Sequence, residues 1–347
     1  MIEKDFENRL IDALQPVRYF ALAHGIHQLM RTGLFQELDS DPGLDTSSLA
    51  GRLDLDPRRL AGLCRYLANE GLLVESDGWR LTEKARSYAP FEAWYTLLIG
   101  GYSTTFTQLG DVLRSGAPWA TRDGASVGEG SCGMSLYDAL PLVDRLLERF
   151  ADEQLTVVDL GCGDASFLIQ LLERHPKWKG VGVEPDAGGA KLAQAQVDRL
   201  GLAHRVRIHN AKAEDATRLE LSGQSERVCF LTAFVLQEML EQEGAEAVEA
   251  LLKDVFTKYP DAHWAVIEVD QRHDDPSVMA HGLGLAYYNP YFLLHTITEQ
   301  RLEPKQFWET MFRRAGLATL ASGHPDQRVD STALELGYLL GTQSEQG

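Results

Sequence analysis

The sequence is poor in cysteine, and its four cysteines stand far apart with no repeated spacing. Such scattering argues against a disulfide framework or a structural zinc site and is typical of a reducing compartment. No apolar run approaches the ~20 residues that a membrane-spanning helix needs. The charged first ten residues lack the apolar core of a signal peptide. We therefore expect a cytoplasmic protein without a membrane partner. The cysteines are Cys64, Cys132, Cys162 and Cys229.

Positive charge is also scarce. The chain has 33 Lys and Arg against 51 Asp and Glu, a formal net charge of −18. A phosphate backbone is repelled by such a field unless a local basic face overrides it, so we expect no nucleic-acid partner. The other proportions are ordinary for a soluble globular protein, with 44% hydrophobic and 24% charged residues. A chain of 347 residues can form two domains with a sizeable core.

The first ninety residues predict a helical domain with a winged-helix pattern. Residues 5–36 carry helical periodicity, and two short helices follow, the second beginning at Asp56 and Pro57. Asp77 and Gly78 then join two short strands, which is a strong hairpin signal. Such a module binds DNA in some proteins and forms a dimer interface in others. The acidic chain favours packing and dimerisation.

After residue 90 the predicted secondary structure changes twice along the chain. Residues 91–150 are mostly helical, apart from a Gly/Ser-rich stretch at 122–135 that predicts a loop over a site or a connector. From 155 onwards apolar strands alternate with amphipathic helices, which predicts a parallel sheet covered on both faces. We expect three parts, 1–90, 91–150 and 151–347. The strands are 156–162, 179–186, 205–211, 227–236 and 263–270, and the helices 165–175, 187–201, 244–258 and 304–315.

A nucleoside site is predicted where the first strand of this α/β domain ends. Gly161 and Gly163 allow a tight turn and close approach of a ligand to the main chain. Asp159 precedes them, and Glu184 ends the next strand, where an acid commonly accepts hydrogen bonds from ribose hydroxyls. The third glycine of a dinucleotide site and the lysine of a P-loop are both missing. The ligand is therefore expected to carry ribose and adenine without phosphates.

The stretches VVDLGCGDASF (157–167) and VGVEPD (181–186) resemble the S-adenosylmethionine (SAM) site of class I methyltransferases. The resemblance implies an α/β Rossmann-like domain that uses SAM. It assigns the methionine end to Asp159, Gly161 and Gly163, and the ribose to Glu184. A nicotinamide site is the alternative, which the missing third glycine disfavours. Further cofactor candidates are Asp164, Thr232 and, for the adenine, either Glu214 or Asp215.

A helical, winged-helix N-terminus before such a domain is similar to small-molecule O- and C-methyltransferases that dimerise through the N-terminal domain. This second resemblance covers essentially the whole chain and implies a homodimer acting in secondary metabolism. In the subgroup that C-methylates 2-oxo acids, it implies a histidine and a carboxylate after the fourth strand, and a second histidine further on, which hold a metal. Here Gln237 stands where that first histidine is expected and Glu238 keeps the carboxylate. Glutamine is a poor transition-metal ligand, so we expect no metal.

A second group of candidates lies at 281–302, which resembles the C-methyltransferases of keto acids, including the keto acid of arginine. The segment is rich in tyrosine and also carries asparagine and histidine, as a small pocket for a sulfonium requires. The alternative is an ordinary subunit-contact segment in which the tyrosines pack and His295 is a satisfied core histidine. With Gln237 and Glu238, the candidate catalytic residues are Tyr288, Asn289 and His295.

Three functions follow from these residues. The favoured hypothesis is methyl transfer from SAM to a small polar acceptor such as a 2-oxo acid. In it Glu238 is the base or a metal ligand, and His295 is a metal ligand or an acid or base. The second keeps SAM but cyclises its aminobutyryl chain to azetidine-2-carboxylate, releasing methylthioadenosine without a metal or an acceptor. The incomplete metal site favours this second reaction. The third, a SAM-sensing DNA regulator, is opposed by the net charge of −18.

Overall fold

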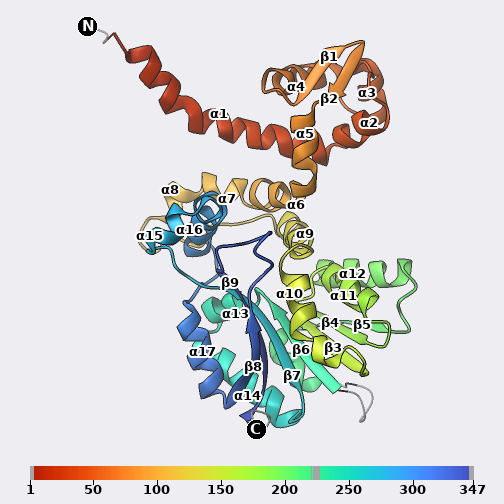
Figure 1. Cartoon of the computed structure of the whole chain (residues 1–347), viewed down its shortest axis with the longest axis vertical. Helices are drawn as coiled ribbons and strands as arrows, with labels where there is room; N and C mark the ends of the chain where they lie inside the picture. The colour runs from red at the N-terminus through yellow and green to blue at the C-terminus, as the bar shows by residue number, and fades with distance from the viewer. Residues whose placement is uncertain (1–3, 220, 222–226, 344–347) are drawn as a thin grey trace. The chain divides into compact units, whose positions relative to one another are not determined.

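The computed structural model in Figure 1 describes residues 4–219, 221 and 227–343. The chain divides into two compact units. The smaller unit runs to Ser103 and also contains Asp123–Ser131, while the larger comprises Thr104–Arg122 and the residues from Cys132 onwards. The span 91–150 contributes to both units, and the predicted three-part division stays a prediction.

The smaller unit contains a bundle of helices with a two-stranded antiparallel sheet. Asp45 and Asp56 begin its third and fourth helices by accepting hydrogen bonds from backbone N–H groups, and Trp79 of the hairpin is buried in the core. The predicted helix start at Asp56 and the hairpin are confirmed. The elements are α1 (Phe6–Arg31), α2 (Leu34–Ser40), α3 (Thr46–Leu53), α4 (Pro57–Asn69), β1 (Leu73–Ser76), β2 (Gly78–Leu81), α5 (Glu83–Tyr88), α6 (Glu92–Tyr95) and a π-helix (Thr96–Gly101).

The prediction of a loop or connector at 122–135 is wrong, because Gly124–Ser135 forms helix α9. One of its glycines, Gly130, allows close packing against another segment. A Cβ atom on Gly130 would lie 2.5 Å from the backbone nitrogen of Leu97, in the π-helix. A Cβ atom on Gly101 would lie 2.7 Å from a methyl of Val127. Two helical segments approach each other here at a distance that side chains would prevent.

The larger unit is built on a seven-stranded sheet of order β5-β4-β3-β6-β7-β9-β8 (Figure 1). The first five strands in this order are parallel, as predicted, whereas β9 runs antiparallel to both β7 and β8. The two strands after 315 were not predicted. The strands are β3 (Leu155–Leu160), β4 (Lys179–Glu184), β5 (Val206–Asn210), β6 (Arg227–Ala233), β7 (His263–Val269), β8 (Leu317–Gly323) and β9 (Glu335–Thr342).

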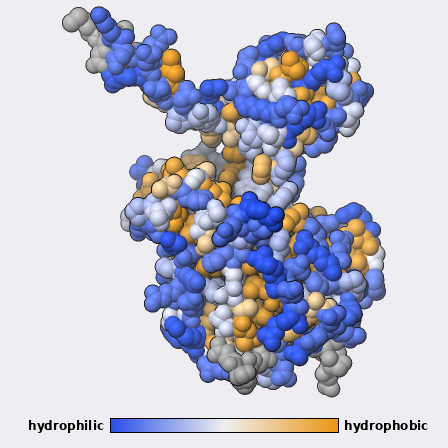
Figure 2. Space-filling model, in the orientation of Figure 1, coloured by the Kyte–Doolittle hydropathy of each residue, from blue (hydrophilic) through white to orange (hydrophobic). Residues whose placement is uncertain are grey.

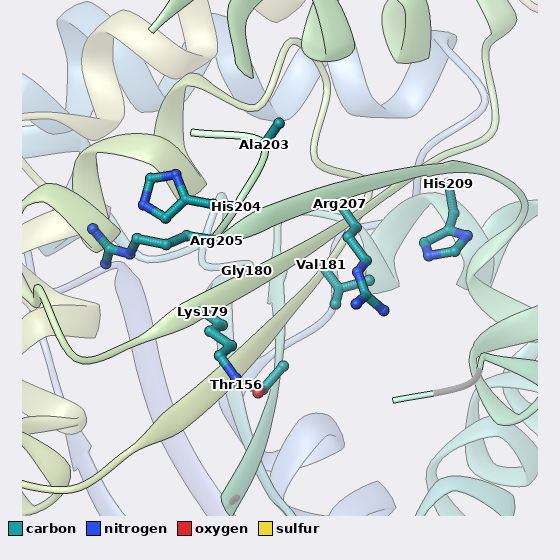
Figure 3. Close-up of a pocket in the computed structure, with 9 residues that line it drawn as sticks. All are labelled: Thr156, Lys179, Gly180, Val181, Ala203, His204, Arg205, Arg207 and His209. Carbon is teal, nitrogen blue, oxygen red and sulfur yellow. The ribbon is translucent and has the colours of Figure 1, made fainter. Parts of the chain in front are cut away.

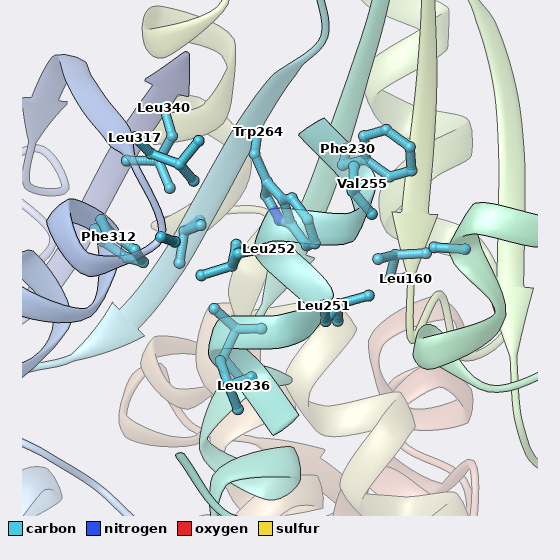
Figure 4. Packing of buried hydrophobic residues seen from close by; sticks show 14 of the residues in the cluster. Leu160, Phe230, Leu236, Leu251, Leu252, Val255, Trp264, Phe312, Leu317 and Leu340 are labelled. Atoms are coloured by element: carbon cyan, nitrogen blue, oxygen red, sulfur yellow. The ribbon is translucent and has the colours of Figure 1, made fainter. Parts of the chain in front are cut away.

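Helices cover both faces of this sheet, and each face has its own apolar core. One core, part of which Figure 4 shows, contains Trp264 and Phe230 of the sheet together with Phe312, whose helix α17 (Lys305–Arg314) packs on the same face. The other packs Trp178, Val157 and helices α10, α11 and α12. The helices of this unit, including those that do not cover the sheet, are α7 (Ser103–Thr107), α8 (Leu109–Val112), α10 (Ala139–Leu146), α11 (Ser166–Arg174), α12 (Ala187–Arg199), α13 (Leu236–Gln242), α14 (Ala245–Lys258), α15 (Pro276–Ala280), α16 (Asn289–Ile297) and α17 (Lys305–Arg314).

The predicted fourth strand at 227–236 is too long. Strand β6 ends at Ala233, and Phe234 takes the left-handed conformation with φ of 60°. This conformation cannot continue a strand, so the chain turns and α13 begins at Leu236. Gln237 and Glu238 therefore stand in the first turn of a helix and not at a strand end.

In the part of the chain that the structure describes, every helix is too short or too polar to cross a membrane.

Candidate active site

The loop after β3 has the backbone that a closely approaching ligand needs. Gly161 and Gly163 have φ of 84° and 56°. A Cβ atom on Gly161 would lie 2.7 Å from a methyl of Val235, so no larger residue fits there. A Cβ atom on Gly163 would meet no atom within 4 Å. The main chain at Gly163 thus borders open space at the carboxyl end of the strand, where α/β sheets bind ligands.

The carboxylate of Glu184, at the end of β4, is held by the same loop. Its Oε2 accepts the backbone N–H of Gly163 at 2.9 Å, and its Oε1 accepts that of Asp186 at 2.9 Å. Burial raises the pKa of Glu184, although the two amides lower it. Each oxygen keeps a further lone pair, so the carboxylate is oriented to accept two hydroxyl groups such as those of a ribose.

Asp159 supplies a second buried carboxyl group beneath the loop. It lies in β3, is 4% exposed, and burial and then the charge of Glu184 raise its pKa to about 7. A cation beside it would relieve this unfavourable burial. An ammonium group, a ribose and a flat base match the two carboxyl groups and the open glycine loop. The residues present therefore fit SAM.

The other four predicted cofactor residues are placed differently. Asp164 bridges two helices, accepting from the Ser166 N–H and from the Gln196 side chain at 2.9 and 3.1 Å. The Thr232 hydroxyl is fully buried and accepts the indole N–H of Trp264 at 3.0 Å. Their binding roles stay predictions. Asp215 pairs with Arg218 at 2.5 Å, whereas Glu214 is exposed.

Gln237 and His295 lie together, although 58 positions separate them. The Nδ1 atom of His295 donates to the carbonyl oxygen of Tyr291 at 2.8 Å, which leaves the lone pair on Nε2. Gln237 Nε2 donates to that atom at 3.3 Å. Burial lowers the pKa of His295 to about 4, so the ring is neutral at pH 7. Among the described residues the buried Oε1 of Gln237 has no hydrogen-bond partner.

Glu238 belongs to a second group, two members of which the sequence analysis missed. Its Oε1 accepts from Arg122 Nη2 at 2.7 Å and from Gln300 Nε2 at 2.8 Å. Arg122 follows α8 and Gln300 follows α16, so three distant segments meet at one carboxylate. No spacing in the sequence signals this meeting.

Glu268 was also missed, although the sequence carries a signal for it. It is the one acidic residue in the apolar strand β7 and is 0% exposed. Its Oε1 accepts the N–H of Leu236 at 3.0 Å, at the start of α13. Burial raises its pKa well above the ordinary value. Glu268 thus fixes the start of the helix that carries Gln237 and Glu238.

The two remaining candidate catalytic residues, Tyr288 and Asn289, have different surroundings. Tyr288 is buried among aromatic residues and donates to Asp330 Oδ2 at 2.5 Å. Asn289 begins α16 with an exposed side chain. The structure brings Gln237, Glu238 and His295 into one region, whereas Asn289 is not joined to it by any hydrogen bond between described residues. Catalytic roles for all of them stay predictions.

Two further observations concern metal ligands and the place of a cavity. In the described part of the chain, no three His, Cys, Asp or Glu side chains stand close enough to hold a metal ion.

A cavity of about 130 Å³, drawn in Figure 3, lies among basic side chains including Lys179 and Arg207. It borders the starts of β3, β4 and β5, at the sheet edge opposite the glycine loop. It is therefore separate from the candidate cofactor site.

The strand order, the glycine loop and the acid ending β4 together define a class I SAM-dependent methyltransferase fold. A family model described as a methyltransferase domain matches residues 157–255. The chain is 48% identical over 341 residues to 2-ketoarginine methyltransferase from Streptomyces arginensis, covering 98% of each chain. The chain belongs to the SAM-dependent methyltransferase family, and SAM is its cofactor.

Solved structures agree on the fold. The mitomycin 7-O-methyltransferase MmcR has a TM-score of 0.67 and 18% identity, with 97% of each chain covered. Human N-acetylserotonin methyltransferase in complex with SAM has a TM-score of 0.64 and 15% identity, with 99% of each chain covered. These identities are low, so the two structures support the architecture and not a substrate.

Proposed function

We propose that the protein transfers the methyl group of SAM to a small 2-oxo acid, with 2-ketoarginine as the first candidate. The observation that carries this proposal is the 48% identity to a 2-ketoarginine methyltransferase, which extends over 98% of both chains. Insertions and deletions that would reshape a pocket are therefore few. The oriented carboxylate of Glu184 and the open backbone at Gly163 support the cofactor half of the reaction.

The cofactor residues have distinct proposed tasks. Asp159 receives the ammonium group of SAM, Gly161 and Gly163 allow its methionine end to approach, and Glu184 accepts the ribose hydroxyls. Bound SAM supplies an electrophilic methyl group. The adenine contact falls to Glu214 or Asp215. Since Asp215 is already paired with Arg218, the exposed Glu214 is the simpler choice.

Glu238 is the proposed base. Methylation beside a carbonyl requires removal of a proton from that carbon, and a carboxylate within reach of the pocket can accept it. Arg122 and Gln300 both donate to Oε1 of Glu238, which leaves Oε2 for the proton. Gln237 then serves as a neutral hydrogen-bonding group for the acceptor, and His295 positions it. A charged imidazolium is not used, because the pKa of His295 is about 4.

The test uses SAM with a ¹³C-labelled methyl group and 2-ketoarginine. We expect the labelled methyl on the carbon next to the carbonyl, detected by mass spectrometry and NMR. The variant Glu238→Gln should lose about 100-fold in kcat or more, with the Kd for SAM unchanged by calorimetry. The partly exposed neighbour Glu241→Gln, on the same helix, is the control. A product labelled on nitrogen or oxygen would contradict the proposal.

Cyclisation of SAM to azetidine-2-carboxylate is a second candidate, and the Gln237–His295 pair favours it. In the described residues this pair and Glu238 do not amount to a metal site, and the free Oε1 of Gln237 can accept from an amine. The α-amine would attack Cγ and release methylthioadenosine. SAM incubated alone would then yield methylthioadenosine, whereas methyl transfer yields S-adenosylhomocysteine only when an acceptor is present.

We also propose a homodimer formed through the N-terminal unit. The support is helix α1, whose first two-thirds expose a row of large apolar side chains, partly visible in orange on α1 in Figure 2. Isolated surface helices do not keep such a row without a partner. We further propose that the N-terminal unit is a winged-helix domain and that the protein is cytoplasmic. The exposed residues are Phe6, Leu10, Ile11, Leu14, Val17, Tyr19 and Phe20.

A further inference from the structure

Three carboxyl groups that the proposed reaction does not use gather where β9 begins. Glu335 is the first residue of β9, is 3% exposed, and is paired with Val269 at the end of β7. It therefore lies at the sheet edge where the parallel strands end, which is the cofactor edge. Asp330 precedes it in the connecting loop and is 5% exposed. Asp138 begins helix α10, accepting the N–H of Ala139 at 2.6 Å, and is partly exposed.

The packing of α10 on β9 brings two of these groups together. Gly337 is two residues after Glu335, so both face the same side of the strand. A Cβ atom on Gly337 would lie 2.7 Å from Leu142, which shows how closely α10 approaches there. Leu142 is one helical turn after Asp138, and its N–H donates to the Asp138 carbonyl at 3.1 Å. Asp138 and Glu335 thus border the same α10–β9 contact.

Hydrogen bonds hold the carboxylate of Asp330 in place, whereas one carboxyl oxygen of Glu335 has no hydrogen bond to a described residue. The Asp330 carboxylate accepts the Tyr288 hydroxyl at 2.5 Å and both the N–H and the hydroxyl of Thr332, at 2.8 and 2.6 Å. By contrast, Oε1 of the buried Glu335 has no hydrogen-bond partner among the described residues. Tyr288 also contributes an aromatic wall, with its ring 6.1 Å from that of Phe292.

The cluster lacks a counter-charge. None of the three carboxyl groups forms an ion pair with a described residue. Burial first, and then the charges of Asp138 and Asp330, raise the pKa of Glu335 well above its ordinary value. Burying several acids together is unfavourable unless a cation joins them. No three acidic, histidine or cysteine side chains of the described chain are close enough for a metal ion. A larger, organic cation fits the spacing better.

We propose that Asp138, Asp330 and Glu335 form a subsite for the guanidinium end of the 2-oxo acid substrate. This inference rests on the proposed function and adds the residues that would select its substrate. A guanidinium presents five N–H donors in one plane, which suits several carboxylates at different positions, and its face stacks on tyrosine. The partly exposed Asp138 gives the ligand access, and the unpaired Glu335 gives it an acceptor.

The test compares 2-ketoarginine with the 2-oxo acid of citrulline, which has the same length and a neutral urea end. The wild-type enzyme should prefer the guanidinium compound in kcat/KM. Glu335→Gln and Asp138→Asn should each reduce this preference at least about tenfold by removing a charged acceptor. Asp326→Asn is the matched control. It removes a carboxylate of the same loop that pairs with Arg328 and lies outside the cluster, so the preference should not change.

Binding separates failure of the subsite from failure of the proposed function. Calorimetry with L-arginine as the probe, run on the SAM-bound enzyme, should show weaker binding to Glu335→Gln than to wild type and Asp326→Asn. If no 2-oxo acid is methylated but this difference appears, the reaction is wrong and the subsite stands. If methylation occurs and folded Glu335→Gln, checked by thermal melting, keeps the wild-type preference and the wild-type affinity for arginine, the subsite is wrong.

Discussion

At the scale of single residues, the proposed cofactor site contains carboxyl groups whose burial is unfavourable without a ligand. Asp159 is the clearest case, since burial raises its pKa to about 7. A carboxyl group with a raised folded-state pKa stabilises the fold only while protonated. This contribution is complete below the unfolded pKa of about 4 and is lost as the pH rises through about 7.

The first prediction concerns Asp159→Asn, measured without SAM. The amide does not ionise, so only the wild-type protein should lose stability as the pH rises. The unfolding free energy of the variant minus that of wild type should therefore increase by about 2 kcal/mol from pH 5 to pH 8. Urea denaturation at both pH values measures this. The same variant should bind SAM at least about tenfold more weakly, because the ammonium loses its partner. A stability difference independent of pH would contradict the explanation.

The second prediction concerns Gly163→Ala. Its φ of 56° costs an alanine roughly 1 kcal/mol, and the new methyl projects into open space where the cofactor is proposed to approach. The Kd for SAM should rise at least about tenfold, measured by calorimetry. Gly201→Ala is the control, since Gly201 has φ of 69° and open space but follows α12, on the side away from the loop. An equal SAM affinity in both variants would refute the placement.

At the scale of elements, the sequence predicts the parallel strands well because each is an apolar run followed by a helix. It fails at α9, where glycine and serine predict a loop and close packing instead produces a helix. It also misses β8 and β9, because these two strands pair antiparallel and lie outside the alternation of strand and helix from which the other strands are predicted. The glycine loop and Glu184 were predictable from a local motif. Arg122 and Gln300 were not, because they reach Glu238 only through tertiary folding.

The third prediction tests this explanation of α9. Gly130→Val places a side chain against the backbone of Leu97 and should destabilise the protein by about 2 kcal/mol or more, measured by denaturation. Gly128→Ala on the same helix is the control, because no atom lies within 4 Å of its added Cβ. It should be neutral or stabilising by about 0.5–1 kcal/mol through helix propensity. Equal effects of the two variants would show that the contact does not matter.

At the scale of the whole molecule, the exposed apolar row on α1 predicts self-association. Leu14→Asp, at a residue 48% exposed, should convert a dimer to a monomer in size-exclusion chromatography with light scattering, since burying an aspartate in an apolar interface is costly. The control is Leu192→Asp on α12, 60% exposed in the other unit, which should leave the mass unchanged. A wild-type protein that is monomeric at micromolar concentration would refute the dimer.

The whole fold does not decide the reaction, because the same architecture carries several chemistries. What separates the two candidates is whether Gln237, Glu238 and His295 act on an acceptor or on SAM itself. The most direct measurement is the nucleoside product, resolved by chromatography after incubation with SAM alone and with SAM plus 2-ketoarginine. We expect S-adenosylhomocysteine, formed only when the 2-oxo acid is present. Methylthioadenosine formed enzymatically from SAM alone would contradict it.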